Sequence, residues 1–145
     1  MRTSFTKLYV HLVWTTWDRL LLISPTIEAR LYAAMVAKCI ELNCEALEIG
    51  GVEDHVHVLV RFTPSITIAD VVKEIKGSSS HLVTHDITPG EFFKWQGAYR
   101  AFTVGPGEVK RVRRYIRHQK AHHRDETQVL EWELPAAISE SDNTE

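Results

Sequence analysis

The sequence predicts an α+β fold, in which a ferredoxin-like (RRM-like) antiparallel sheet is covered by helices on one face and followed by one more helix. Two observations predict this class. Segments with strand-like alternation and segments with helical spacing follow one another as strand, helix, strand, strand, helix, strand, helix, which is the split βαβ pattern plus a final helix. The chain also has 145 residues, 44% apolar and 25% charged, which suits a single globular core.

The first strand and the first helix are predicted in the N-terminal third of the chain. Residues 5–17 are rich in aromatic and β-branched residues and alternate in part, which favours a strand. Ser24 and Pro25 favour a helix start, because serine can cap a helix and proline suits its first position. We expect this helix to run to about Leu42 and to end at Asn43. Its inward-facing residues are expected to be Ile27, Leu31, Ala34, Met35 and Ile40.

A hairpin is predicted in the middle of the chain. Residues 44–51 are the second strand candidate, and Glu53 and Asp54 form the turn into the third, residues 55–62. Successive side chains of a strand point to opposite faces of its sheet. The third strand therefore has one face with His55, His57, Leu59 and Arg61 and another with Val56, Val58, Val60 and Phe62. Two imidazoles thus share one face of the sheet.

The second helix is predicted to begin after Thr67, because a threonine followed three residues later by the acid Asp70 has the pattern of a helix cap. It is expected to extend to about Leu82, with Gly77 and the three serines after it loosening its second half. Its inward-facing residues are expected to be Ile68, Val71, Val72, Ile75 and Leu82.

The C-terminal part is predicted to contain one strand, one long helix and a tail. Residues 98–105, "AYRAFTVG", favour the strand, and the glycines and proline of residues 105–107 introduce a helix that runs to about Arg124. We assign residues 1–134 to a single domain and residues 135–145 to an acidic, mobile tail.

The net charge of −2 hides a polarity along the chain. Seven basic and no acidic residues lie between Lys110 and Arg124, whereas seven acidic and no basic residues lie between Asp125 and Glu145. A dense basic segment can bind phosphates, although such runs are also typical of solvated helix faces. No apolar stretch approaches the roughly 18 residues of a membrane-spanning helix, and the start lacks a secretory segment. The two cysteines have neither redox nor zinc spacing, and we expect a cytoplasmic protein.

Two pairs of residues could carry chemistry. His55 and His57 lie roughly 6.6–6.8 Å apart along a strand, so both imidazoles can converge on one metal ion, although a third ligand must then come from elsewhere. Tyr115 and Gln119 are four residues apart on one face of the last predicted helix. Each pair also has a purely structural interpretation, as half-exposed histidines and as a core tyrosine beside a surface glutamine. Spacing alone leaves both interpretations open.

Five blocks in the right order resemble one protein family. The blocks are "YVHLVWTT", "IGGVEDHVHVLV", "VVKEIKGSSS", "KWQGAYRAFTVG" and "VRRYIRHQKAHHR". With them, residues from about Ser4 to Trp132 resemble the single-tyrosine HUH transposases of small bacterial insertion sequences (insertion sequence 200/605 type), where U is a bulky apolar residue. The chain departs from the family at Trp17, where a lysine is usual, and at Ala98 and Arg100, where glycines are common. These departures concern DNA sequence preference rather than chemistry.

The resemblance implies a site. His55 and His57 would bind a divalent metal ion, Mg²⁺ or Mn²⁺, Gln119 would complete the protein ligands, and Tyr115 would be the nucleophile. Asp54 would shape the turn without touching the metal. The histidines expected at the surface or on DNA, with no ligand role, are His118, His122 and His123.

The resemblance also implies an activity. The enzyme would cleave and rejoin single-stranded DNA at hairpin-marked element ends through a 5′-phosphotyrosine, as a homodimer in which the tyrosine helix can reach the partner's site. No nucleotide cofactor is expected, because the bond energy stays in the covalent link and the chain has no P-loop. The alternatives are a domesticated module that binds hairpin DNA without transposition and a metal-dependent hydrolase. The expected DNA contacts are Lys73, Lys76, Arg100, Arg113, Arg114, Arg117 and Lys120, with Trp14, Trp17 and Trp95 either stacking on bases or lying in the core.

Overall fold

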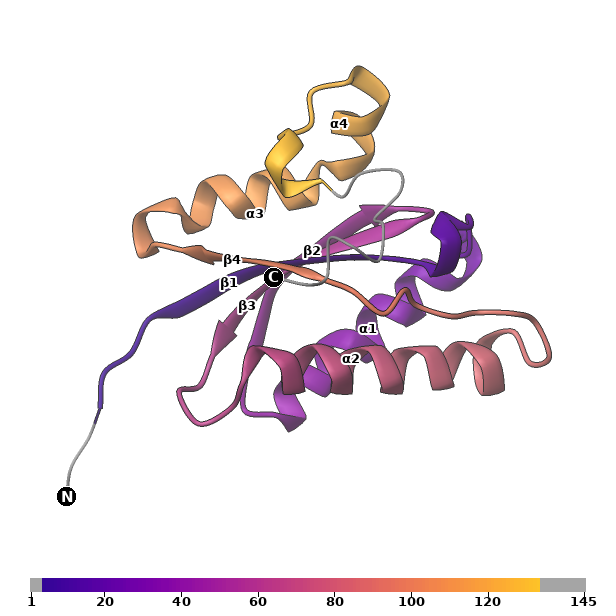
Figure 1. Cartoon of the computed structure of the whole chain (residues 1–145), viewed down its shortest axis with the longest axis horizontal. Helices are drawn as coiled ribbons and strands as arrows, with labels where there is room; N and C mark the ends of the chain where they lie inside the picture. The colour runs from indigo at the N-terminus through magenta and orange to yellow at the C-terminus, as the bar shows by residue number, and fades with distance from the viewer. Residues whose placement is uncertain (1–3, 134–145) are drawn as a thin grey trace.

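A computed structural model of the chain describes residues 4–133 and has the predicted α+β, ferredoxin-like arrangement (Figure 1). One antiparallel sheet has the strand order β2-β3-β1-β4, which is the split βαβ topology. The predicted tail, residues 135–145, lies outside the described residues. The regular elements are β1 (Leu8–Thr15), α1 (Pro25–Glu41), β2 (Glu45–Val52), β3 (His55–Phe62), α2 (Ile68–Leu82), β4 (Arg100–Val104), α3 (Val109–Arg117) and α4 (Gln119–Asp125).

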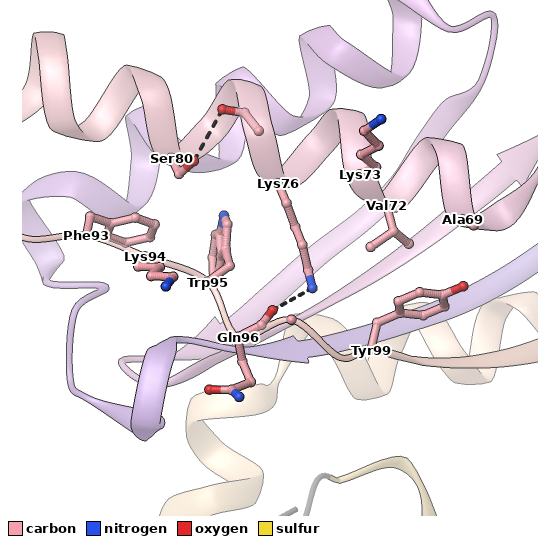
Figure 2. A pocket seen from close by; sticks show the side chains of 12 residues that line it. Ala69, Val72, Lys73, Lys76, Ser80, Phe93, Lys94, Trp95, Gln96 and Tyr99 are labelled. Carbon is pink, nitrogen blue, oxygen red and sulfur yellow. Dashed lines mark hydrogen bonds between the residues drawn. The ribbon is translucent and has the colours of Figure 1, made fainter. Parts of the chain in front are cut away.

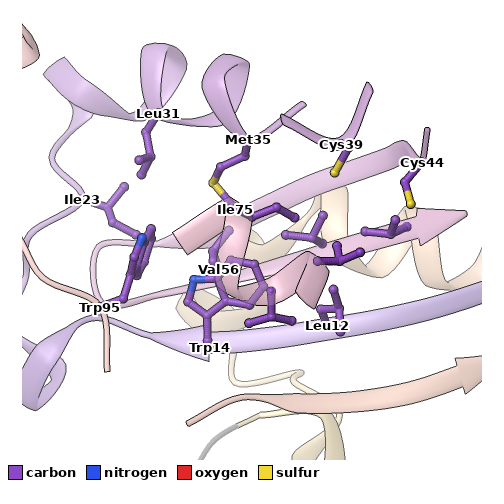
Figure 3. Packing of buried hydrophobic residues seen from close by; sticks show 14 of the residues in the cluster. Leu12, Trp14, Ile23, Leu31, Met35, Cys39, Cys44, Val56, Ile75 and Trp95 are labelled. Carbon is purple, nitrogen blue, oxygen red and sulfur yellow. The ribbon is translucent and has the colours of Figure 1, made fainter. Parts of the chain in front are cut away.

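Helices cover both faces of the sheet. Helices α1 and α2 lie on one face, and α3 and α4 lie on the other (Figure 1). The larger hydrophobic core lies between the sheet and the α1/α2 layer, where Trp14, Val56 and Met35 are fully buried (Figure 3). A smaller cluster around Leu59 and Ile116 lies under α3. The predicted alternation of β3 is confirmed, because its valines and its histidines enter different layers.

The first helix begins at Pro25, as predicted, but its inward stripe differs from the predicted one. Ile27, Leu31 and Met35 are buried and Ala34 is half-buried, whereas Ile40 is 65% exposed and Cys39 is fully buried in its place. The correction follows from helix geometry: a step of four residues from Met35 stays on the same face, and the next residue is rotated by about 100° toward solvent. Cys39 is therefore a packing residue of the core.

The second helix has the predicted cap and the predicted length. The Thr67 hydroxyl accepts a hydrogen bond from the Asp70 backbone N–H at 3.1 Å. The helix continues without a break through Gly77 and the serines, and the expected loosening of its second half stays a prediction. Serine hydroxyls donate back to helix carbonyls, and the buried Ser79 also accepts the indole N–H of Trp95 at 3.0 Å. These bonds and the packing of Ser79 offset the low helix propensity of the segment.

The long C-terminal helix that the sequence predicts is two helices. The backbone leaves helical geometry at His118, with φ −104° and ψ 28°, so α3 ends at Arg117 and α4 starts at Gln119. No proline or glycine marks this position, which is why periodicity alone predicts one helix. Helix α3 packs closely on β2 at Gly50. Only glycine fits there, since a Cβ added to Gly50 would lie 2.0 Å from the carbonyl oxygen of Ile116. None of the helices in residues 4–133 is long and apolar enough to span a membrane.

Candidate active site

The structure brings the four residues of the predicted site together. His55 and His57 point from β3 toward the α3/α4 layer and are 1% and 0% exposed. The His55 Nε2 atom lies 3.4 Å from Gln119 Oε1, and the ring centroids of His57 and Tyr115 are 5.8 Å apart. The break at His118 does not separate the pair on the last two helices, because Gln119 Nε2 still lies 3.5 Å from the carbonyl oxygen of Tyr115. Two histidines, an amide and a phenol therefore line one buried site.

Glu133 also belongs to this site, and sequence reasoning missed it. Its Oε2 atom lies 3.1 Å from His55 Nε2 and 3.2 Å from His57 Nε2. Its Oε1 atom accepts the hydroxyl of Tyr115 at 2.5 Å. The carboxylate reaches the site because the chain after α4 folds back over the sheet. One acid in an acidic C-terminal segment carries no sequence signal of such a contact.

The segment before Glu133 is fixed against the site by packing and hydrogen bonds. The Trp132 ring packs edge-on against Tyr115 and His11, with centroids 5.0 and 5.3 Å away. The Val129 backbone N–H donates to the Tyr115 hydroxyl at 2.9 Å. The Arg100 guanidinium lies 3.4 Å from the Glu133 carbonyl oxygen. The position of the carboxylate thus depends on several independent contacts.

His123 lies at the site rather than on the outer surface, which corrects the sequence expectation. Its Nε2 atom is 3.2 Å from Gln119 Oε1 and 3.4 Å from Glu133 Oε2. Its ring centroid is 4.7 Å from that of His55. The cause is the four-residue spacing from Gln119, which places His123 on the same face of α4 once this helix is turned at His118. Its neighbour His122 stacks on Tyr115 with centroids 4.6 Å apart.

Asp54 orients His55 from the hairpin turn. Its Oδ1 atom lies 2.8 Å from His55 Nδ1, and its Oδ2 atom accepts a hydrogen bond from Arg19 Nε at 3.1 Å. Burial alone would raise the pKa of Asp54. The hydrogen bonds and charges of His55 and Arg19 outweigh burial and lower this pKa below its usual value, so the carboxylate stays ionised. An ionised acceptor at Nδ1 fixes the ring and directs the Nε2 atom of His55 into the site.

His11 supports the second histidine in the same way. This β1 residue is fully buried, and its Nε2 atom lies 2.8 Å from His57 Nδ1. Burial, followed by the nearby His57, lowers the pKa of His11 to about 3, so the ring is neutral. Sequence reasoning did not select His11, although a histidine among the apolar residues of "YVHLVWTT" was the available signal. The contact leaves Nε2 of His57 directed at the site.

The electrostatics of the site centre on Glu133. Burial raises its pKa, but hydrogen bonds from His55 and His57 outweigh burial and hold the pKa far below its usual range. Burial alone would lower the pKa of His55, whereas Asp54 and Glu133 together raise it to about 9. Burial and the hydrogen bond to Glu133 raise the pKa of Tyr115. The phenol is therefore protonated at neutral pH and needs help to act as a nucleophile.

The donor atoms fit a divalent metal ion. One nitrogen each of His55 and His57 and a carboxylate oxygen of Glu133 lie within 4.8 Å of one another. The Gln119 amide oxygen lies beside the same nitrogen of His55. Imidazole nitrogens and oxygen donors at such separations are the ligands that Mn²⁺, Zn²⁺ and related ions prefer.

The basic residues of the last two helices lie outside this buried site. Lys110, Arg113 and Arg114 line the outer side of α3 together with Arg117. Arg117 also donates to Glu48 Oε1 at 2.8 Å, and Lys120 Nζ lies 2.7 Å from Glu28 Oε1. The structure thus places these predicted DNA contacts on the surface, some of them already in ion pairs.

Lys76 lines a separate cavity of about 480 Å³ between α2 and the segment that precedes β4 (Figure 2). Its ammonium group donates to the carbonyl oxygens of Gln96 and Ala98 at 2.7 and 3.0 Å. Burial lowers the pKa of Lys76 to about 8. Lys73 and Lys94 also line the cavity, and none of the described residues around it carries a carboxylate. This cavity therefore combines positive charge with an aromatic wall that includes Tyr99, Phe93 and Trp95.

The three tryptophans that could stack on bases have different environments. Trp14 and Trp95 are 0% and 6% exposed and pack edge-on against each other in the main core (Figure 3). Trp17 is 40% exposed, with Lys94 Nζ 4.1 Å from its ring centroid. Of the three, only Trp17 presents a ring that a base can reach.

A ferredoxin-like sheet that carries a His-Val-His strand opposite a tyrosine helix defines the class of HUH-type tyrosine transposases. The chain belongs to the transposase IS200-like family, whose family model matches residues 4–119 and so includes both histidines, Tyr115 and Gln119. Glu133 lies beyond the matched residues. The expected family and fold are confirmed.

Two solved structures are similar to the chain. A candidate transposase from Deinococcus radiodurans R1 is 25% identical, with a TM-score of 0.61 over 82% of this chain and 95% of that chain. A REP-associated tyrosine transposase bound to a REP hairpin is 14% identical, with a TM-score of 0.63 over 98% of this chain and 92% of that chain. The second likeness shows the fold alone. Among curated proteins, none matches the chain by sequence.

Proposed function

We propose that the protein is a transposase that cleaves and rejoins single-stranded DNA at hairpin-marked ends by metal-assisted tyrosine transesterification. The observation that carries the proposal is the position of Tyr115, whose ring lies 5.8 Å from that of His57 in a member of a transposase family. A tyrosine with only a packing role would not need its hydroxyl at a polar site beside paired histidines. Family membership supports the reaction class, and the buried polar cluster supports the residues.

The nucleophile is the hydroxyl oxygen of Tyr115. It attacks the phosphorus of the scissile phosphate while Glu133 Oε1, which accepts its hydrogen bond, orients it, and the proton that it loses is balanced by the proton that the leaving 3′ oxygen gains. The bond between phosphorus and the 3′ oxygen breaks, and that oxygen takes up a proton and leaves as a 3′-hydroxyl. The product is a 5′-phosphotyrosine. A 3′-hydroxyl of another strand reverses the step and joins new ends without ATP.

His55, His57 and Gln119 are proposed as ligands of a divalent cation, Mg²⁺ or Mn²⁺. Such a cation supplies positive charge to the oxygens of the scissile phosphate when it is bound. Asp54 and His11 direct the imidazole nitrogens inward, and the packed wall of α3 and Trp132 restricts access of water to the Tyr115 hydroxyl. Exclusion of water favours rejoining over hydrolysis.

The DNA contacts are proposed on two surfaces. Arg113, Arg114, Arg117 and Lys120 lie near the site on the outer side of the last two helices and can follow backbone phosphates. Lys76 lines the separate cavity, where the exposed Tyr99 ring can stack on an unpaired base. The similar REP-associated transposase was solved with a hairpin, which supports a hairpin as the substrate of this chain. Arg100 also holds the C-terminal segment, so its role in DNA binding is secondary.

A homodimer remains part of the proposal, with the glycines of residues 105–107 as a hinge that could let α3 reach a partner. The contacts of Tyr115 with Glu133 and His57 occur within one chain, which supports cleavage at the chain's own histidines. Mixing a Tyr115→Phe chain with a His57→Ala chain tests exchange. Recovery of cleavage in the mixture would show that two chains share a site, and its absence would support the single-chain arrangement.

The test of the function is to trap the covalent intermediate. The full chain is incubated with Mn²⁺ and a labelled single-stranded DNA that carries a hairpin, and a denaturing gel is read for a protein–DNA adduct. The wild type should form the adduct and Tyr115→Phe should not, while Tyr99→Phe serves as a control for loss of an exposed phenol.

The result separates the alternatives. Cleavage without an adduct would support a hydrolase in which water attacks, and hairpin binding without cleavage would support a binding module. Either result would overturn the proposed transesterification.

A further inference from the structure

The Glu133 carboxylate contacts both halves of the candidate active site. One oxygen, Oε2, lies 3.1 and 3.2 Å from the Nε2 atoms of His55 and His57. The other, Oε1, accepts the Tyr115 hydroxyl. The side chain of Glu133 is only 11% exposed, so it is not a solvated member of an acidic tail. An acid in this position can serve the metal ion and the nucleophile together.

The separations between donor atoms match those of a coordinated metal. Metal–ligand bonds of about 2.0–2.3 Å place neighbouring ligand atoms roughly 3.0–3.5 Å apart. Glu133 Oε2 lies within this range of both histidine nitrogens, and Gln119 Oε1 is 3.4 Å from His55 Nε2. Surface ion pairs do not place one oxygen between two imidazoles that are both nearly fully buried. This arrangement fits a set of metal ligands.

The position of Glu133 is fixed by groups other than the histidines. The Arg100 Nη1 atom lies 3.5 and 3.4 Å from the carbonyl oxygens of Glu131 and Glu133. Trp132 lies between Glu131 and Glu133 in the sequence and packs on Tyr115. Its ring centroid is also 5.3 Å from the Cζ atom of Arg111. The backbone is therefore held where the carboxylate can reach β3, as a preorganised ligand requires.

We propose that Glu133 is the anionic ligand of the divalent cation, joining His55 and His57, and that its second oxygen holds the Tyr115 hydroxyl beside that cation. Two imidazoles and one carboxylate favour Mn²⁺, Fe²⁺ or Co²⁺ over Mg²⁺, because nitrogen ligands suit the transition metals. The histidines thereby set the preference for a transition metal, and Glu133 supplies the negative charge that balances the cation. The ligand role stands without DNA, whereas the role in holding the nucleophile rests on the proposed transesterification.

The test measures Mn²⁺ binding to the full, DNA-free chain by electron paramagnetic resonance, which counts free Mn²⁺ directly. Glu133→Gln should weaken binding by at least about tenfold, while Glu131→Gln should leave it within about twofold. Glu131 is the matched control, because it removes the same charge from the same segment at an exposed position. Equal Mn²⁺ affinity of the two variants would overturn the proposal. Circular dichroism of each variant establishes that it is folded.

Two further measurements complete the test. Glu133→Asp should regain part of the Mn²⁺ affinity lost in Glu133→Gln, because it restores the anionic oxygen at a shorter reach. Adduct formation with hairpin DNA should fall in Glu133→Gln, and a rise would show instead that the carboxylate occupies the position of the phosphate, which would overturn the proposal. If Mn²⁺ binding depends on Glu133 but wild type forms no adduct, the ligand assignment stands and the proposed transposase chemistry fails.

Discussion

The two faces of the sheet are built from the same strands but are stabilised differently. Toward α1 and α2, β3 presents Val56 and Val58 to a continuous hydrocarbon core, and toward α3 and α4 it presents His55 and His57 to polar groups. All four side chains are 1% exposed or less. Burial of a valine needs only shape, whereas burial of an imidazole also needs a partner for each nitrogen. The side chains on the two faces are equally buried, but the apolar face requires only close packing and the polar face also requires hydrogen-bond partners.

The partners on the polar face form two pairs of contacts. Asp54 holds His55, and His11 holds His57, each with ring nitrogens 2.8 Å from the partner atom. Removing such a partner leaves a buried polar atom unsatisfied, whereas truncating a core side chain leaves a cavity. Substitutions on the polar face should change chemistry first, and substitutions on the apolar face should change stability first.

The largest effect is expected for His57→Ala on the polar face. Adduct formation with hairpin DNA should fall on the order of 10²–10³-fold or more, because the variant removes a proposed metal ligand. Hairpin affinity, measured by gel shift, should stay within about twofold, since the basic surface provides it. His85→Ala, which changes an exposed histidine after α2, is the control and should retain both activities. A parallel loss of binding and cleavage in His57→Ala would contradict the division between the two faces.

Leu31→Ala tests the apolar face. Leu31 is a residue of α1 whose side chain is fully buried in the main core. Its truncation should lower the free energy of unfolding by about 2–5 kcal/mol in urea titrations. Adduct formation per folded molecule should not change. Ile40→Ala, on the same helix but 65% exposed, should cost less than about 0.5 kcal/mol. If the two variants lost similar stability, the assignment of the inward face of α1 would be wrong.

Much of the fold could be predicted because each element shows its own periodicity. The two-residue period of β3 separated the histidines from the valines. The four-residue spacing put Tyr115 and Gln119 on one helix face, and the family resemblance assigned them to the site. The failures concern features that local pattern does not encode. Ile40 fitted an apolar stripe only loosely, and the rotation of the helix buries Cys39 in its place. The break at His118 has no proline or glycine to mark it in the sequence.

The candidate site was predictable only where its residues lie on regular elements. Glu133 reaches His55 through an irregular segment fixed by Arg100 and Trp132, and these are tertiary contacts without a sequence signature. His123 required the turn of α4. His11 could have been found, because a histidine among strand hydrophobics demands a buried partner, yet only the structure identifies that partner as His57.

Asp54→Asn sharpens the comparison by altering the polar face without removing a proposed ligand. Loss of the anionic acceptor at His55 Nδ1 should weaken Mn²⁺ binding about 10–100-fold, because outer-shell acceptors set ring orientation and ligand basicity. Titration of the DNA-free chain followed by electron paramagnetic resonance measures the change. Glu53→Gln removes the same charge from the same turn at an exposed position and should bind Mn²⁺ normally. Equal affinities would mean that Asp54 only shapes the hairpin.

The smallest effect is expected on the free energy of unfolding, at the N-termini of α1 and α2. The sequence predicts that Ser24 and Thr67 both cap a helix, but in the structure only Thr67 does. Thr67 accepts the Asp70 N–H, so Thr67→Ala should lower the free energy of unfolding by about 1 kcal/mol. Ser24 makes no such bond, and its hydroxyl instead contacts that of Thr26, so Ser24→Ala should change stability by only a few tenths of that amount. Urea titrations measure both losses of stability. Adduct formation should stay unchanged in each variant, because the two caps lie on the apolar face of the sheet. A loss of Mn²⁺ affinity in either variant would instead show that the two faces are coupled through the sheet.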